Sequence, residues 1–351
     1  MTTSRAPAPP APSPPGTPAD AAAPDDRLLM DTFMSQYRLP AVAVADRLGL
    51  FAALAAAPSD VGALAGAHGL DRHGTSVLLE FLAAQGYLAV HGGRYRPTPS
   101  ARAFLLPGSA RYWGPMLGLG WDERCTAVQQ VVTTGTPHGY RGKGIWETHG
   151  RSRRHGEQFT RAMHAHSAAP AAALAAQLDL AGCAALLEVA GGVGTFAMAL
   201  ARRNPHLKAT VLDLPVVERE AHRLLADADL ADRVALRTGD MFTDPWPHGQ
   251  DRVLFADVLS DWDDERCRTL LERARAALAA DGRLLVHQVL PDDAARLSPT
   301  VTGYSLALAV MTGGRLRTLP ELTALLTAAG FTDCAALPVY GHYALVTARP
   351  A

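Results

Sequence analysis

The hydrophobic residues of this chain follow a helical spacing in its first half and gather into short runs in its second half. Between residue 28 and about residue 106, apolar positions recur every three or four residues, which predicts a set of packed helices. From residue 184 onward, short apolar runs alternate with helical segments; the runs are residues 186–189, 209–213, 234–236, 253–255 and 284–286. This alternation predicts a doubly wound α/β domain with a parallel sheet, closed by an antiparallel pair at residues 331–333 and 343–346.

The helical half is predicted to contain three helices and a small hairpin. One helix ends near Gly49, a second starts with Ser59 or Asp60 as its N-cap, and a third covers about residues 73–85. A hairpin that turns at residues 92–93 follows, and the whole resembles a winged-helix module. The third helix has almost no Arg, Lys or Asn with which to contact DNA, so we interpret the module as a dimer interface.

Composition and charge exclude several classes of partner. The chain has 351 residues, 48% of them hydrophobic, and a net charge of −1, which gives no electrostatic reason to bind nucleic acid or an anionic membrane. Its four cysteines are scattered, as is typical of reduced, buried thiols. The N-terminus lacks a long apolar stretch, so we expect neither a signal peptide nor a membrane span. We therefore expect a cytoplasmic protein.

A glycine-rich turn joins the first apolar run to the next helix. Residues 188–197 read Glu-Val-Ala-Gly-Gly-Val-Gly-Thr-Phe-Ala. Gly191, Gly192 and Gly194 let the backbone approach a ligand closely, and the N-terminus of the following helix favours a negative group such as a carboxylate. The turn lacks the lysine of a P-loop and is not the Gly-x-Gly-x-x-Gly of dinucleotide-binding folds. A nicotinamide dinucleotide therefore remains only as an alternative ligand.

Two further motifs narrow the choice of cofactor. Asp213, followed by Leu214, ends the second apolar run, where a carboxylate can accept hydrogen bonds from ribose hydroxyls. After the third run, Asp240 can meet an adenine amino group, and Met241 or Phe242 can cover the ring. The three motifs in this order resemble the class I S-adenosylmethionine (SAM) methyltransferases, which have a Rossmann-like α/β fold.

Two other segments point to one family within that class. Residues 256–265 read Ala-Asp-Val-Leu-Ser-Asp-Trp-Asp-Asp-Glu, and residues 162–167 read Ala-Met-His-Ala-His-Ser. With the cofactor motifs, they resemble the caffeate- and acetylserotonin-type O-methyltransferases, a group that includes many bacterial enzymes of natural-product tailoring. The resemblance covers about residues 28–350. It implies an intertwined homodimer that uses SAM and acts on a small-molecule acceptor.

The resemblance also divides the chain and assigns residues. Residues 1–25 are a Pro/Ala-rich tail that cannot bury enough apolar surface to fold, so we expect it to be disordered. The resemblance implies a winged-helix dimerisation domain at 26–110, a helical linker and acceptor-pocket region at 111–180, and a SAM-binding Rossmann-like domain at 181–351. The residues expected at SAM are Ser167, Glu188, Gly191, Gly192, Gly194, Asp213, Leu214, Asp240, Met241, Phe242 and Asp257. Those expected at the acceptor are Trp113, Met116, Trp121, Met163, His164 and Met311.

The chain departs from the family pattern where the family handles protons. The usual base histidine of a His-Asp-Trp loop is replaced by Ser260. A glutamate that often supports that base is replaced by His287, and a second one by Leu316. Because an unassisted serine hydroxyl does not take up a proton near neutral pH, the serine cannot substitute for the histidine. The candidate catalytic residues are therefore His287, His166, Ser260 and Asp261.

Three kinds of chemistry remain open at this stage. The first is methyl transfer with another base or none, to an aromatic hydroxyl by family precedent, with an amine or a carbon as the runner-up acceptor. The second is a SAM-binding homologue that carries out decarboxylation, hydroxylation or cyclisation without transferring the methyl group. The third is a metal-dependent variant in which His164, His166 and His287 hold iron or zinc, although no spacing motif supports it. A winged-helix regulator that senses SAM is the non-enzymatic alternative.

Overall fold

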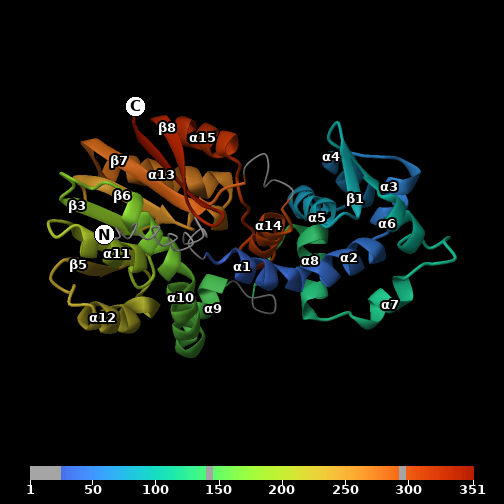
Figure 1. The fold of residues 1–351 in the computed structure, drawn as a ribbon, viewed down its shortest axis with the longest axis horizontal. Coiled ribbons are helices and arrows are strands. Elements are labelled where there is room, and N and C mark those ends of the chain that lie inside the picture. Colours follow the sequence, from blue (N-terminus) through green and yellow to red (C-terminus); the bar gives the residue numbers. More distant parts are fainter. Residues whose placement is uncertain (1–24, 140–144, 292–297) are drawn as a thin grey trace, which may run out of the picture.

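The computed structural model describes residues 25–139, 145–291 and 298–351, and they form two lobes joined by helices (Figure 1). The predicted disordered tail at residues 1–25 lies outside the described residues except for Asp25. Among the described residues no single helix is long and apolar enough to cross a membrane. Within the same described ranges, one bent pair, Arg27–Arg47 with Leu50–Ala56, meets the length and composition requirement jointly, and most residues of Arg38–Arg47 are buried in the core.

The first lobe is helical and carries a two-stranded hairpin. Its elements are α1 (Arg27–Met34), η1 (Ser35–Tyr37), α2 (Arg38–Arg47), α3 (Leu50–Ala56), α4 (Val61–His68), α5 (Arg72–Ala84), β1 (Leu88–His91), β2 (Arg94–Pro97), α6 (Pro99–Phe104), α7 (Gly114–Leu119) and α8 (Glu123–Thr134). The predicted third helix and hairpin are confirmed, and Asp60 is the N-cap of α4. The inner face of α5 is buried against α8 and α14, so this helix is a core element of the lobe.

The second lobe is a three-layer α/β domain around a seven-stranded sheet. Its strands are β3 (Ala185–Val189), β4 (Lys208–Asp213), β5 (Val234–Thr238), β6 (Gln250–Ala256), β7 (Leu278–Val289), β8 (Phe331–Tyr340) and β9 (Tyr343–Pro350). The strand order is β5-β4-β3-β6-β7-β9-β8, parallel from β5 to β7 and antiparallel at β9 and β8. This arrangement confirms the doubly wound sheet and its closing antiparallel pair, and the order reverses between β3 and β6.

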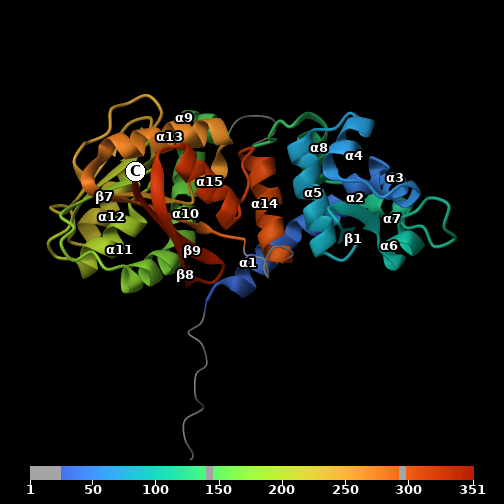
Figure 2. The same ribbon diagram turned by 90° about the horizontal axis from the view of Figure 1, so that it is seen from above.

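Helices cover both faces of this sheet and link it to the first lobe. They are α9 (Ile145–Arg151), α10 (Arg153–Gln177), α11 (Thr195–Arg203), η2 (Pro215–Val217), α12 (Glu218–Asp227), η3 (Leu259–Asp261), α13 (Asp264–Ala277), α14 (Pro299–Met311) and α15 (Leu319–Ala328). Although α14 follows β7 in sequence, it packs against α5 and α1, and Leu306, Ala309 and Val310 belong to the first lobe's core. Figure 2 shows α14 between the two lobes. It therefore brings the carboxyl ends of β6 and β7 close to the helical lobe.

Candidate active site

The glycine-rich turn lies at the carboxyl end of β3 and leads into α11. Gly192 and Gly194 have positive φ angles of 59° and 79°, a region that favours glycine. A Cβ atom on Gly194 would also come within 2.8 Å of the Val211 side chain. Beneath the turn, a Glu188 carboxylate oxygen accepts a hydrogen bond from the backbone N–H of Ala197 at 2.9 Å. Burial raises the pKa of Glu188 to about 8, so this carboxyl group supports the turn from inside the domain.

Asp213 connects the ends of two neighbouring strands. One oxygen of its carboxylate accepts from the Gly192 N–H and the other from the Leu214 N–H, both at 2.6 Å. Burial raises the pKa of Asp213 to about 6, and the two N–H donors oppose that shift. A carboxylate held in this way keeps lone pairs for further donors. It therefore fits two adjacent ribose hydroxyls above the end of β4.

An aromatic cluster stands beyond the end of β5. The backbone N–H of Phe242 donates to the Asp240 carboxylate at 2.8 Å, which fixes the turn. The Phe242 ring meets Trp262 edge-to-face with centroids 5.0 Å apart, and Trp146 stacks on Trp262 at 6.3 Å. Met241 packs partly buried against the same core. Trp146 and the Arg266 guanidinium already lie against the Trp262 ring, so the role expected for Asp240, Met241 and Phe242 at a purine ring stays a prediction.

The loop after β6 carries three of the candidate residues. Asp257 has a φ of +55°, and its N–H donates to the carbonyl oxygen of His287 at 2.8 Å. Burial raises the pKa of Asp257 to about 8 and that of Asp261 to about 7. Ser260 is 1% exposed, and its hydroxyl has no hydrogen-bond partner. The loop therefore presents two carboxyl groups that burial keeps partly protonated, and no histidine.

His287 is buried at the end of β7 in a largely aromatic setting. Its ring stacks on Tyr343 with centroids 5.1 Å apart and lies 4.8 Å from the ring of Phe196. Neither ring nitrogen has a hydrogen-bond partner, and burial lowers the pKa of His287 to about 3. An imidazole in this setting stays neutral and holds a proton poorly at neutral pH. The catalytic role expected for His287 stays a prediction that this environment does not favour.

The other two histidines of interest point in different directions from α10. The Nδ1 atom of His164 lies 2.9 Å from the Thr195 hydroxyl, on the side of α11. The Nε2 atom of His166 lies 3.1 Å from the Tyr343 hydroxyl, on the side of β9. Within the described part of the chain, no group of three or more His, Cys, Asp or Glu side chains is arranged to hold a metal ion. The facial set of His164, His166 and His287 is therefore not formed.

The remaining expected residues fall into two groups. Ser167 and Met163 lie on α10, which packs against α11, and Met311 lies at the end of α14, one residue before the Thr312 side chain that bonds Asp261. By contrast, Trp113 and Met116 lie at the start of α7 in the helical lobe, 55% and 58% exposed. Trp121 also packs in that lobe, beneath the Arg47 guanidinium at 4.2 Å. Within one chain, these last three residues are not brought to the cofactor motifs.

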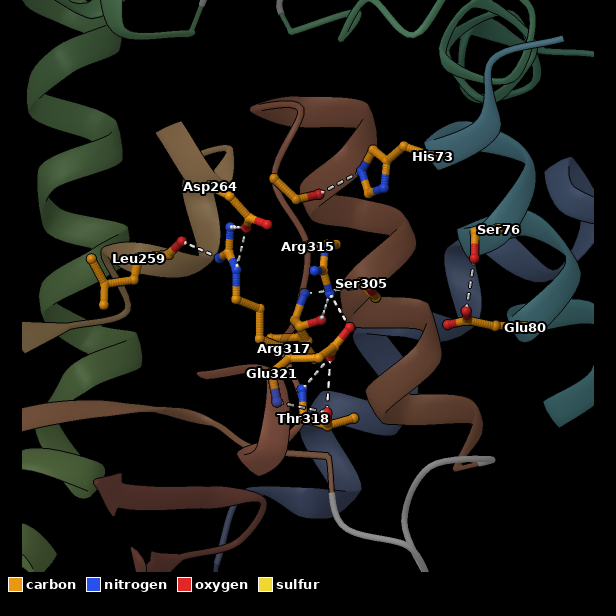
Figure 3. Close-up of polar contacts among 12 residues, drawn as sticks. His73, Ser76, Glu80, Leu259, Asp264, Ser305, Arg315, Arg317, Thr318 and Glu321 are labelled. Atoms are coloured by element: carbon orange, nitrogen blue, oxygen red, sulfur yellow. Dashed lines mark hydrogen bonds and ion pairs between the residues drawn. The ribbon is translucent and has the colours of Figure 1, made fainter. Parts of the chain in front are cut away.

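A buried arginine that the sequence did not single out holds the loop after β6 in place (Figure 3). The guanidinium of Arg317 donates to the carbonyl oxygens of Leu259 at 2.7 Å and Trp262 at 2.8 Å. It also forms an ion pair with Asp264 at 2.6 Å. Gly314 packs so tightly on this loop that a Cβ atom there would overlap the Ser260 carbonyl oxygen. The carbonyl oxygen of Gly314 lies 3.1 Å from Nε2 of His73, which ties the segment after α14 to α5.

The arrangement fits SAM as cofactor. The glycine turn offers close backbone approach, Asp213 offers a buried carboxylate at the second strand, and the aromatic cluster stands at the third. All three lie at the carboxyl edge of the sheet, next to the β3–β6 crevice where ligands bind in doubly wound folds.

Comparison with known proteins agrees with this assignment. Residues 126–332 match the model of the O-methyltransferase domain, and residues 30–107 match that of the O-methyltransferase dimerisation domain. The chain is 32% identical to 3-hydroxy-5-methyl-1-naphthoate 3-O-methyltransferase of Streptomyces sahachiroi, over 87% of this chain and 89% of that protein. It is also 32% identical to aclacinomycin 10-hydroxylase RdmB of Streptomyces purpurascens, over 91% of this chain and 87% of that protein.

Solved structures give the same result. An O-methyltransferase family 2 protein from Planctomyces limnophilus, in complex with apigenin, superposes with a TM-score of 0.80 at 26% identity, covering 94% of this chain and 97% of that one. Other similar structures have been solved with SAM bound.

Proposed function

We propose, on the premise that this chain belongs to the O-methyltransferase family, that it methylates a hydroxyl group of an aromatic small molecule without a histidine base at position 260. The chain is a SAM-dependent methyltransferase by family membership. The observation that carries the finer proposal is the contrast between the two halves of the site. The cofactor motifs are complete, whereas the position of the family's base holds a buried serine.

The residues of the chain divide the work of the reaction. Bound SAM supplies an activated methyl group on a sulfonium. The glycine turn and Asp213 hold the cofactor at the end of β3 and β4, and the Phe242–Trp262 pair covers its base. Alignment of acceptor and donor and exclusion of water then supply much of the rate enhancement. A proton must still leave the acceptor, and a positioned base contributes about 10²–10⁴-fold to that step.

The acceptor class follows from the relatives and is tested with a panel. The Streptomyces sahachiroi relative methylates a hydroxynaphthoate, and the Planctomyces structure holds the flavone apigenin. We expect the protein, incubated with SAM and a hydroxylated naphthalene or flavone, to yield S-adenosylhomocysteine and a methyl ether. NMR locates the methyl group on the product. Methylation of nitrogen or carbon in a matched amine or enol panel, with no ether formed, would contradict the hydroxyl assignment.

The Ser260→Ala variant tests whether position 260 takes part in proton transfer. The Ser260 hydroxyl is buried and has no partner, so its removal deletes no hydrogen bond. We expect kcat and kcat/KM to change by less than about threefold, because a serine hydroxyl does not hold the proton. A loss of a hundredfold or more, measured by S-adenosylhomocysteine release, would assign Ser260 a direct role.

One relative supports a second candidate function. RdmB is named as a hydroxylase although it shares the family's sequence over most of its length. The missing base histidine is compatible with such non-methylating chemistry in this chain as well. Conversion of an acceptor without stoichiometric S-adenosylhomocysteine would favour this second function over methyl transfer.

We further propose that the chain is a homodimer formed through the helical lobe. Residues 30–107 of the lobe match the family's dimerisation domain. The lobe exposes large apolar side chains on α1 and, just beyond that match, at α7; they are Leu28, Leu29, Phe33, Trp113, Met116 and Leu119. A cavity of about 510 Å³ beside α7, lined in part by Leu39, Phe104 and Trp113, is available to a partner side chain. Trp113 and Met116 are then expected to be covered in the dimer.

The Met116→Arg/Leu119→Arg double variant tests this interface. We expect it to halve the mass seen in sedimentation at micromolar concentration, because two charges would be buried without partners. Leu337→Arg is the matched control, since Leu337 is 47% exposed on β8 in the other lobe. A double variant that stays dimeric, or a control that dissociates equally, would contradict the assignment.

A further inference from the structure

A group of acidic, phenolic and imidazole side chains gathers at the carboxyl ends of β6 and β7. The groups that face Asp257 or one another there are Asp26 ahead of α1, His166 of α10, Asp261 of η3, His287 of β7, Tyr304 of α14 and Tyr343 of β9. Tyr304 is hydrogen-bonded to Tyr343, whose hydroxyl meets His166. Both Asp257 and Asp261 lie close enough to Tyr304 to raise its pKa.

Asp257 has the position within this group that a proton acceptor needs. In the parallel register Val189, the last residue of β3, pairs with Phe255 of β6, and Asp257 directly follows the end of β6 where the strand order reverses. One oxygen of the Asp257 carboxylate is buried without any hydrogen-bond partner. The Val289 N–H faces the carboxylate and stabilises its charged form.

We infer that Asp257 accepts the proton of the acceptor hydroxyl during methyl transfer, in place of the histidine that position 260 lacks; this rests on the proposed function. The acceptor oxygen forms a bond to the methyl carbon while the carbon–sulfur bond breaks. The electron pair of that bond stays on sulfur and gives the neutral thioether S-adenosylhomocysteine. The hydroxyl proton moves to the free oxygen of the Asp257 carboxylate and leaves to solvent after product release.

The backbone at this position is consistent with such a role. Asp257 is one of four non-glycine residues with positive φ in the described chain; the others are Ala190, Asp229 and Asp333. Aspartate and asparagine tolerate this conformation better than most residues. Asp257→Asn therefore keeps the backbone and the volume of the side chain while removing its ability to take up a proton.

The pH dependence of turnover separates Asp257 from the other groups. In the wild type we expect kcat/KM with a hydroxynaphthalene acceptor to rise with pH and level off, because the carboxylate must be deprotonated to act as the base. Asp257→Asn should lose that rising limb and about 10²-fold in kcat, with the Kd of S-adenosylhomocysteine unchanged. Asp229→Asn is the matched control, with the same substitution and backbone conformation on an exposed surface turn, and should behave as the wild type.

The unligated protein provides a readout that needs no acceptor. The folded pKa of Asp257 lies above its unfolded value of 3.8, so its stabilising contribution is complete below pH 3.8 and disappears as pH rises toward about 8. The urea midpoint of the wild type should fall across this window, and Asp257→Asn should fall less. An unchanged pH dependence of stability in the variant would overturn the inference whether or not an acceptor is known.

The activity measurements have their own contradicting results. If Asp257→Asn keeps its rising limb and its turnover, the proton goes elsewhere, and an Asp261→Asn variant that loses the limb would identify Asp261 instead. If Asp257→Asn weakens S-adenosylhomocysteine binding as strongly as it lowers kcat, Asp257 is a cofactor ligand and the inference is wrong. A wild-type protein that forms no S-adenosylhomocysteine with any acceptor contradicts the proposed function. That result differs from the two outcomes described for Asp257→Asn.

Discussion

Replacing Arg317 with methionine should lower the free energy of unfolding by about 2–4 kcal/mol, because two main-chain carbonyls would lose their donors inside the protein. The Arg317 side chain is 2% exposed and donates to Leu259 and Trp262 on either side of the Ser260–Asp261 turn. Methionine keeps an unbranched side chain in the same space but supplies no donor. Urea unfolding followed by circular dichroism measures the shift in midpoint, and the same variant should bind SAM more weakly because Trp262 is released.

The neighbouring Arg315→Met variant is the matched control. Arg315 is 31% exposed, and its side chain pairs with Glu321 at 2.9 Å near the surface, where an ion pair contributes about 0–1 kcal/mol. The two variants make the same chemical change two residues apart. Equal losses of stability would show that the buried contacts of Arg317 do not hold the loop.

Replacing Asp213 with alanine should weaken SAM binding by about 10²-fold or more, since hydrogen bonds to a charged group contribute about 1.5–3 kcal/mol each. The variant removes the acceptor expected for the ribose hydroxyls. It also frees the Gly192 and Leu214 N–H groups that now donate to the carboxylate, so the glycine turn loses an anchor. Isothermal titration with S-adenosylhomocysteine measures the change directly.

An exposed aspartate in the same domain controls for the loss of a charge. Asp232 lies on the surface before β5, and Asp232→Ala should bind S-adenosylhomocysteine with the wild-type Kd. A variant at Asp213 that retains wild-type affinity would contradict the placement of the cofactor above β4.

The cofactor half of the site could be predicted because each of its motifs ends a parallel strand. Apolar runs locate strands, and the carboxyl ends of parallel strands meet at one edge of the sheet. Gly191, Asp213 and Asp240 therefore had to lie close together once the runs around them were identified. The comparisons confirm the family and the cofactor, while the role of each residue stays a prediction.

The proton-handling half depends on contacts between segments far apart in sequence. Tyr343 meets His166 across 177 positions, and α14 leaves the sheet to pack in the helical lobe. Nothing in the residues around Arg317 indicates that its guanidinium is buried beneath η3. His287 was correctly expected at the end of a strand, but its stacking between Phe196 and Tyr343 and its lowered pKa arise from packing that no local pattern records.

The most direct test of this account uses SAM with a deuterated methyl group and a hydroxylated aromatic acceptor. Mass spectrometry should find the intact deuterated methyl on the acceptor oxygen, with one equivalent of S-adenosylhomocysteine for each product molecule. An acceptor that is altered while the deuterated methyl stays on SAM would contradict methyl transfer and identify the chain as a family member with different chemistry.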